Sequence, residues 1–404
     1  MPIQFRAWLP DGFEKIKGLI ISLPGTRGDQ QGITGNSQWQ FRLSQMGYGI
    51  VGFRDGDFGS DYWGSGLDEG NANLQLVLDS IANSFGHPEI KNAPILIDGV
   101  SKGGFAVGHL ASLVPERTLG FIADKGYSYG ALDDQIYSAP GVAIAGRYDS
   151  VVPATGLQQA FTIGRLFDLN LAFVVEWRTS HVETTENLRL AIMDQMIRAR
   201  YPHVHLPSLA PNEPLTLNEP TGWLGEAPQI DDQGALVYNP LPIIAPESAY
   251  PLDPLKASWF ANATLATIFQ SHNDDTFSTK PLQMSVISPI NGKIRMRFSV
   301  NGIVSHRLEL YHEEELIGIF DPSAGPIQFT YEARQNGLHT FIGKAEYVSN
   351  GETKYTTNYL ASVVQGVVIV PEPVGITLFI LSGIVWAFLG RFGRGIASSN
   401  PSII

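Results

Sequence analysis

Short apolar runs rich in β-branched residues alternate with helix-like segments between residues 17 and 200, and this alternation most constrains the fold. The runs of strand type are 18–25, 47–53, 93–99, 119–124, 141–146 and 171–177. The segments with helical spacing are 37–46, 67–85, 102–114, 154–166 and 182–199. Alternation of this kind predicts an α/β fold with a mostly parallel sheet and helices on both faces. Reactive groups in such folds gather beyond the carboxyl ends of the strands.

Charge and cysteine content exclude several classes of protein. A formal net charge of -12 argues against a nucleic-acid-binding protein that works through a basic face. The chain has no cysteine, which excludes a disulfide framework, a thiolate zinc site and a cysteine nucleophile. We expect neither a metal nor a cofactor.

Three predicted strands end in residues that could form a catalytic array. Gly99-Val100-Ser101-Lys102-Gly103 follows one strand and opens a helix, the setting in which a tight turn exposes a serine hydroxyl. Asp149 follows the strand at 141–146, and His181 follows the strand at 171–177. The order serine, acid, histidine along parallel strands predicts that the three meet at one edge of the sheet.

These motifs together resemble the α/β-hydrolase superfamily, in particular its secreted esterases and depolymerases. The resemblance covers about half of the chain. It implies that Ser101 is a nucleophile, that His181 is a general base and then an acid, and that Asp149 orients the imidazole. It also implies an oxyanion hole formed by the backbone N–H groups of Lys102 and Thr26.

Each residue also has a structural interpretation. Ser101 could occupy a tight turn in a catalytically inactive fold, Asp149 could cap the next helix, and His181 could be an ordinary loop residue.

Residues 55–61 carry alternating carboxylates like those of a calcium loop, but Ser60 and Gly66 stand where that loop needs glycine and glutamate. We instead expect Tyr62 and Trp63 of this loop to line a substrate-binding groove, although ordinary packing would also explain them.

The second half of the chain has a different pattern. We divide the chain into a hydrolase domain at 1–205, a proline-rich strap with a short helix at 206–280, a β-sandwich at 281–366 and a tail at 367–404. Ten prolines between residues 207 and 254 exclude a long helix there, and a helix is predicted at 258–270. Alternation over 282–365 predicts about seven strands, which resemble a bacterial immunoglobulin-like domain. Near the start, residues 3–9 read as a strand that a turn at Pro10-Asp11-Gly12 joins to the next strand as a hairpin.

The C-terminal tail carries an ordered set of signals. Pro371-Glu372-Pro373 precedes 16 uncharged residues at 374–389, and Arg391 and Arg394 follow them. This order resembles the PEP-CTERM sorting signal of exported bacterial proteins, which implies a transmembrane helix, a transient membrane anchor and an exosortase-type processing protease as partner. An ordinary tail anchor is the alternative. Because residues 1–12 lack a secretion signal, we expect the natural start to lie upstream.

The sequence therefore predicts an exported serine hydrolase of the cell envelope or exterior. Its expected substrate is a polymeric or surface-associated carboxylic ester, and no nucleic acid is expected as a partner. The alternatives are a serine peptidase of the same fold and a catalytically inactive surface-binding protein.

Overall fold

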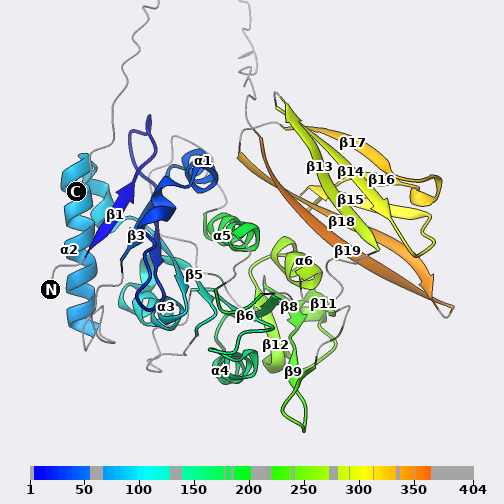
Figure 1. Ribbon diagram of the computed structural model, residues 1–404, viewed down its shortest axis with the longest axis horizontal. Coiled ribbons are helices and arrows are strands. Elements are labelled where there is room, and N and C mark those ends of the chain that lie inside the picture. The colour runs from blue at the N-terminus through cyan, green and yellow to red at the C-terminus, as the bar shows by residue number, and fades with distance from the viewer. Residues whose placement is uncertain are drawn as a thin grey trace, which may run out of the picture.

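The computed structural model describes residues 4–54, 67–127, 139–176, 179–182, 186–201, 217, 221–237, 239, 242–272, 281–290, 292–312, 314–333, 337–349 and 351–364. In this part of the chain seven strands form one sheet, in the order β1-β3-β2-β4-β5-β6-β7 (Figure 1). Their bounds are β1 (Phe5–Trp8), β2 (Gly18–Leu23), β3 (Tyr48–Phe53), β4 (Ile95–Val100), β5 (Thr118–Asp124), β6 (Gly141–Gly146) and β7 (Leu171–Glu176). Strands β2 to β7 pair in parallel. The predicted mostly parallel sheet is thus confirmed.

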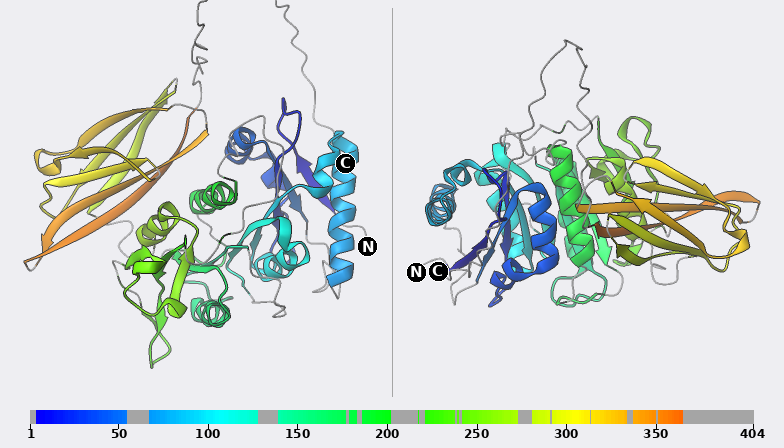
Figure 2. Two further views of the ribbon diagram at one scale, coloured as in Figure 1. Left: turned by 180° about the vertical axis from the view of Figure 1, so that it is seen from behind. Right: turned by 90° about the horizontal axis from the view of Figure 1, so that it is seen from above.

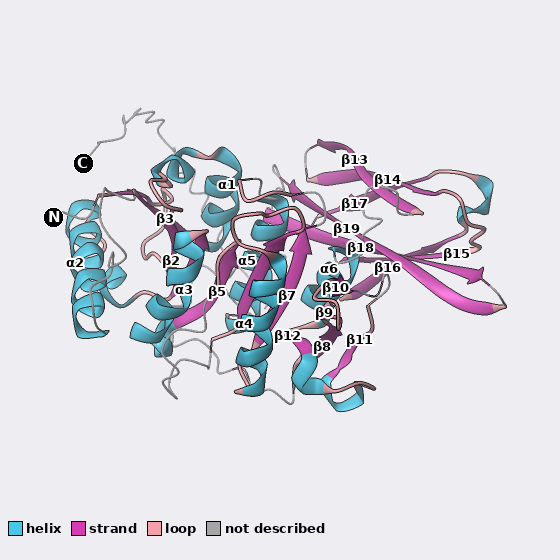
Figure 3. Cartoon of the chain, turned by 60° about the horizontal axis from the view of Figure 1, so that its bottom comes forward, coloured by secondary structure: helices cyan, strands magenta, loops and turns pink. Residues whose placement is uncertain are grey.

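Helices cover both faces of this sheet (Figures 1 and 3). One face packs against α2 (Leu67–Phe85), α3 (Lys102–Leu113) and α4 (Ala154–Leu166), and the other against α1 (Ser37–Met46) and α5 (Glu186–Arg200). Strands β2 to β7 are almost wholly buried because both of their faces are covered, which explains why they read as continuous apolar runs in the sequence. The arrangement fits the α/β-hydrolase fold.

The predicted N-terminal hairpin is wrong. β1 pairs antiparallel with β3, with Phe5 opposite Phe53, and does not pair with β2. Gly12 does lie in a turn, at φ +82°. The turn exists as predicted, but β3 occupies the sheet position between β1 and β2, so the turn joins two strands that are not neighbours.

The strap forms a small sheet at the edge of the large one. Its three strands lie in the order β11-β8-β12. Their bounds are β8 (Trp223–Glu226), β11 (Ile244–Pro246) and β12 (Ala257–Phe260). A separate two-stranded sheet pairs β9 (Gln229–Ile230) with β10 (Leu236–Val237). The Phe173 N–H on edge strand β7 donates to Ser258 Oγ at 2.9 Å, and Arg165 Nε on α4 donates to the Ala257 carbonyl at 2.9 Å. These bonds fasten the strap to the open edge of the large sheet.

The helix expected at 258–270 is partly wrong. Residues 257–260 form β12, and the helix α6 (Ala263–His272) begins only afterwards. Asn262 marks this start, since its Oδ1 accepts the Leu265 N–H at 2.8 Å. Short 3-10 helices occur at Gln31–Gly35, Pro88–Asn92, Pro115–Arg117, Glu247–Ala249, Pro254–Lys256 and Pro322–Ala324.

Two further sheets pack against each other in the C-terminal part. One has the order β13-β14-β17 and the other β16-β15-β18-β19. The bounds are β13 (Leu282–Ile290), β14 (Lys293–Val300), β15 (Arg307–His312), β16 (Glu315–Phe320), β17 (Ile327–Glu332), β18 (Gly337–Ser349) and β19 (Glu352–Val364). Phe298 and Phe341, one from each sheet, lie in a shared apolar core. These seven strands lie between residues 282 and 364, within the segment whose alternation predicts about seven strands.

The sandwich lies beside the α5 and α6 side of the α/β half (Figure 2). Tyr359 on β19 packs against the apolar cluster that α5 and α6 form on the large sheet. Among the helices described, none is long and apolar enough to cross a membrane. The predicted membrane helix at 374–389 and the motif Pro371-Glu372-Pro373 lie outside the described residues.

Candidate active site

Ser101 occupies the sharp turn between β4 and α3. Its backbone has φ 54° and ψ -116°, a left-handed conformation that costs free energy for a residue with a side chain. Small neighbours make the turn possible. A Cβ on Gly103 would lie 2.7 Å from the Pro24 carbonyl oxygen, and a Cβ on Gly99 would lie 2.5 Å from the carbonyl carbon of Gly103. The glycines of the motif are therefore required by packing.

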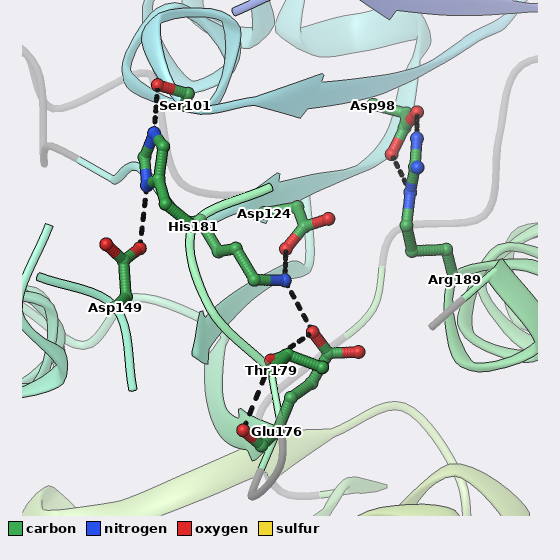
Figure 4. A network of polar contacts seen from close by, with 9 residues as sticks. Asp98, Ser101, Asp124, Asp149, Glu176, Thr179, His181 and Arg189 are labelled. Atoms are coloured by element: carbon green, nitrogen blue, oxygen red, sulfur yellow. Dashed lines mark hydrogen bonds and ion pairs between the residues drawn. The ribbon is translucent and has the colours of Figure 1, made fainter. Parts of the chain in front are cut away.

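Three side chains meet at this turn (Figure 4). His181 Nε2 lies 2.8 Å from Ser101 Oγ, and His181 Nδ1 lies 2.7 Å from Asp149 Oδ2. The Asp149 carboxylate is fully buried, whereas the imidazole keeps 18% of its surface exposed. The structure thus brings together the three residues that the sequence singles out, in an unbroken hydrogen-bonded row that leads from a buried acid to an accessible hydroxyl.

The loop after β6 holds Asp149 by its second oxygen. Asp149 Oδ1 accepts the N–H groups of Val151 and Val152, each at 2.8 Å. The residue at the N-cap of α4 is Pro153, so Asp149 orders the loop that leads to the helix but does not cap it. These two bonds leave Oδ2 directed at the imidazole.

Two backbone segments border the serine where an oxyanion hole would be needed. Lys102 is the first residue of α3, and N–H groups in a helix's first turn point out of an end that favours negative charge. The loop after β2 passes close by, because a Cβ on Gly25 would lie 3.3 Å from Ser101 Cβ. Thr26, the second predicted donor, is the next residue of that loop.

A buried cluster of charges lies behind these residues. Lys125, fully buried just after β5, places its Nζ 3.0 Å from Asp124 Oδ1 and 2.5 Å from Glu176 Oε2. Burial raises the pKa of Asp124 to about 6, with Glu176 adding to the rise and the cations Lys125 and Arg189 opposing it. We call Lys125, Asp124 and Glu176 the strand-end cluster.

A second buried pair lies on the α5 side of the sheet. Arg189 on α5 donates from Nε to Asp98 Oδ1 at 3.0 Å and from Nη2 to Asp98 Oδ2. Ser22 Oγ on β2 donates to the same carboxylate at 3.2 Å. Desolvation lowers the pKa of Arg189, but the adjacent Asp98 and Asp124 outweigh it and keep the pKa above its ordinary value.

The sequence analysis missed both clusters. The available signal was a charged residue at or near the end of an otherwise apolar strand, which Asp98, Asp124 and Glu176 all share. A charge in that position is buried and must be paired. The two residues predicted to line a substrate groove, Tyr62 and Trp63, lie outside the described residues.

A cavity of about 480 Å³ lies elsewhere, between the strap, α6 and the sandwich. It is lined by Trp223, Tyr311 and Tyr355 among others, and by none of the three residues of the hydrogen-bonded row. This cavity is therefore separate from Ser101, His181 and Asp149.

Comparison with known proteins gives similarity in structure only. No protein-family model and no curated protein matches the chain. The chain is similar to the solved structure of esterase PE8, at 16% identity with a TM-score of 0.37, covering 48% of this chain and all of that one. It is also similar to the Bacillus cereus carboxylesterase, at 14% identity and a TM-score of 0.32, over 46% of this chain and 89% of that one. A third similar structure is mouse alpha/beta hydrolase domain-containing protein 10, at 16% identity and a TM-score of 0.34, over 49% of this chain and 99% of that one.

Proposed function

We propose that the protein is a serine hydrolase that cleaves carboxylic esters through an acyl-enzyme. The observation that carries the proposal is the hydrogen-bonded row Ser101–His181–Asp149 at 2.8 and 2.7 Å, placed at a strained turn. Local strain needs support from its surroundings and is concentrated at functional sites. An inactive turn would need neither the positive φ at Ser101 nor a buried carboxylate aimed at the imidazole.

Each residue has a defined task in the proposed reaction. His181 Nε2 takes the proton of Ser101 as the serine oxygen attacks the ester carbonyl carbon, and Asp149 stabilises the imidazolium that forms. The tetrahedral oxyanion is bound by the N–H groups of Lys102 and Thr26. The imidazolium then protonates the leaving alkoxide, which departs as the alcohol. Water, deprotonated by His181, cleaves the acyl-enzyme and releases the carboxylic acid.

The remaining parts of the proposal rest on the sequence. We infer export to the cell envelope or exterior, a transient anchor at 374–389, and recognition of Pro371-Glu372-Pro373 by an exosortase-type processing protease. The inferred substrate is a polymeric or surface-associated ester, and Tyr62 and Trp63 are proposed to contact it. The sandwich is proposed to be an immunoglobulin-like module, and its pairing order, with first, second and fifth strands in one sheet, supports this.

Hydrolysis of short-chain p-nitrophenyl esters tests the proposal, with a peptide p-nitroanilide run in parallel. Wild type should hydrolyse the esters, and Ser101→Ala should lose at least about 10³-fold in kcat. The matched control is Ser44→Ala, which removes an equally small hydroxyl from α1. Ester activity that survives Ser101→Ala would refute the mechanism, faster cleavage of the anilide would favour a peptidase, and no activity in folded wild type on either would favour a binding protein.

A further inference from the structure

We propose that Lys125 is a positioning residue that holds the three triad-bearing strand ends in register. The inference rests on the proposed serine hydrolase function. The structure links this one side chain, directly or through one neighbour, to the segments that carry Ser101, Asp149 and His181. Lys125 itself touches none of the reacting atoms.

Lys125 places a positive charge in the interior of the protein. Lys125 is fully buried and its φ is 52°, a left-handed conformation in a residue with a long side chain. Its Nζ joins Asp124 at the end of β5 to Glu176 at the end of β7, and so spans the intervening strand β6. Burying a lysine costs free energy unless its ammonium is paired, so the two carboxylates fix the side chain.

The link to the nucleophile runs through both neighbours of Lys125. The Asp124 carbonyl accepts the Ser101 N–H at 2.8 Å. On the other side, a Cβ on Gly126 would lie 2.8 Å from the carbonyl carbon of Ser101, which shows how closely the two backbones pass. The backbone of residues 124–126 is therefore a support against which the strained serine turn rests.

The link to the acid runs through β6. The Lys125 N–H donates to the Ile144 carbonyl at 2.7 Å. The lysine side chain then passes over Gly146, where its Cε would lie 3.1 Å from a Cβ built on that glycine. Gly146 begins the turn that presents Asp149, since its carbonyl accepts the Asp149 N–H at 3.2 Å.

The link to the histidine runs through Glu176. Its Oε2, the oxygen that receives Lys125, also accepts the Thr179 hydroxyl at 3.2 Å (Figure 4). Thr179 precedes His181 by two residues, and its carbonyl accepts the Tyr148 N–H at 3.0 Å. The same short segment thus connects the histidine loop to the residue before Asp149.

Loss of the ammonium would leave the backbone links to Ser101 and β6 in place, but it would release the ion pairs that hold them against the histidine loop. Asp124 and Glu176 would then face each other without a cation, and one of them would take up a proton because two neighbouring buried carboxylates cannot both stay charged. The ion pairs that tie the end of β5 to the end of β7 would be lost. Because a displacement of about 1 Å can cost about 10²-fold in rate, we expect a loss of kcat of about 10- to 100-fold in Lys125→Met. KM should change by less than about threefold, since Lys125 touches no substrate.

The matched control is Arg189→Met, which removes a cation from the buried pair with Asp98. That pair joins β4 to α5, and the Arg189 side chain is nearly as buried as that of Lys125, at 7% against 0% exposed. The two variants should lose comparable thermal stability. Assayed well below its melting temperature, Arg189→Met should keep a kcat within about threefold of wild type, whereas Lys125→Met should not.

A milder variant keeps the test decisive if Lys125→Met does not fold. Thr179→Val removes the hydroxyl contacts to Oε2 and to the backbone carbonyl of Glu176, each at 3.2 Å, and should lower kcat about 3- to 10-fold. Thr267→Val is its control, because it removes a comparable hydroxyl bond within α6. Proton NMR gives a readout apart from turnover. The low-field signal of the proton between His181 and Asp149 should be present in wild type and shifted or broadened in Lys125→Met and Thr179→Val.

The outcomes separate this inference from the proposed function. A folded wild type without hydrolase activity would refute the proposed function, and the NMR comparison would still test the positioning role. Wild-type kcat and an unchanged low-field signal in folded Lys125→Met, or in Thr179→Val where Lys125→Met does not fold, would overturn the inference. An equal loss of kcat in Arg189→Met would overturn it too, because the effect would then follow from stability alone.

Discussion

Gly126 gives the sharpest test of how the strained serine is supported. In Gly126→Ala the new methyl carbon would lie 2.8 Å from the Ser101 carbonyl carbon and 3.1 Å from its Cα, and nearer still to the carbonyl oxygen. Unstrained carbon atoms pack about 3.5–4.0 Å apart, so the two backbones must separate by about 1 Å. Both are backbone segments, and neither can rotate away as a flexible side chain would.

The expected cost follows from that displacement. Moving Ser101 by about 1 Å from His181 should lower kcat about 10²-fold, which corresponds to about 2.7 kcal/mol in the activation barrier. Overpacking should also lower the free energy of unfolding by about 1–3 kcal/mol. We expect both effects together, because the same contact that holds the turn also packs the core.

The assay is kcat on a p-nitrophenyl ester, measured with a thermal melt of the same sample. Gly156→Ala is the matched control, since a Cβ there meets nothing within 4 Å. Its position in α4 means that alanine should leave kcat unchanged and stability equal or slightly higher. A Gly126→Ala protein with wild-type kcat and melting temperature would show that the close approach of residues 101 and 126 is not needed.

Three other perturbations follow from the same geometry. Asp149→Asn should lower kcat about 10⁴-fold with little change in stability, because Oδ1 can keep its loop bonds while the amide nitrogen faces His181; steady-state kinetics and urea unfolding check this. Burial raises the pKa of Asp124 to about 6 in the fold, above its value of about 4 in the unfolded chain. Between about pH 4 and 6 the folded protein therefore keeps a proton on Asp124 that the unfolded chain has lost. The contribution of this group to the free energy of unfolding falls as the pH rises through that range. Asp124→Asn should make the unfolding free energy fall less over that range than in wild type, and parallel pH curves would contradict this. Arg189→Met should lower the free energy of unfolding in urea by about 3–5 kcal/mol, because it leaves the buried Asp98 carboxylate without its cation. A loss below about 1 kcal/mol would show that the pair is solvated.

Much of the α/β half can be predicted from local signals. Strands buried on both faces are apolar apart from single charged residues at or near the ends of β4, β5 and β7, and turn residues bound them. Ser101, Asp149 and His181 can be chosen because each lies in the loop that follows such a strand, and the ends of parallel strands share one edge of a sheet. The order of the three residues along the chain can be read from the sequence, whereas the hydrogen bonds among them depend on the fold.

What could not be predicted depends on which strands become neighbours. The turn at Gly12 looks the same whether or not the strands beside it pair, so the place of β3 between β1 and β2 could not be read from it. The bond between Lys125 and Glu176 joins residues 51 apart and exists because β5, β6 and β7 lie side by side. Residues 258–260 look helical in isolation, yet they form a strand along edge strand β7. There the Ser258 Oγ accepts the backbone N–H of Phe173 on β7.

Covalent labelling of the intact protein by a fluorophosphonate tests the central claim most directly. The reagent phosphonylates only a serine that a neighbouring base activates. Mass spectrometry of the digested protein should find one equivalent of label on the peptide that contains Ser101, and none there in Ser101→Ala. Folded protein that takes up no label, or takes it up at a serine other than Ser101, would contradict the account.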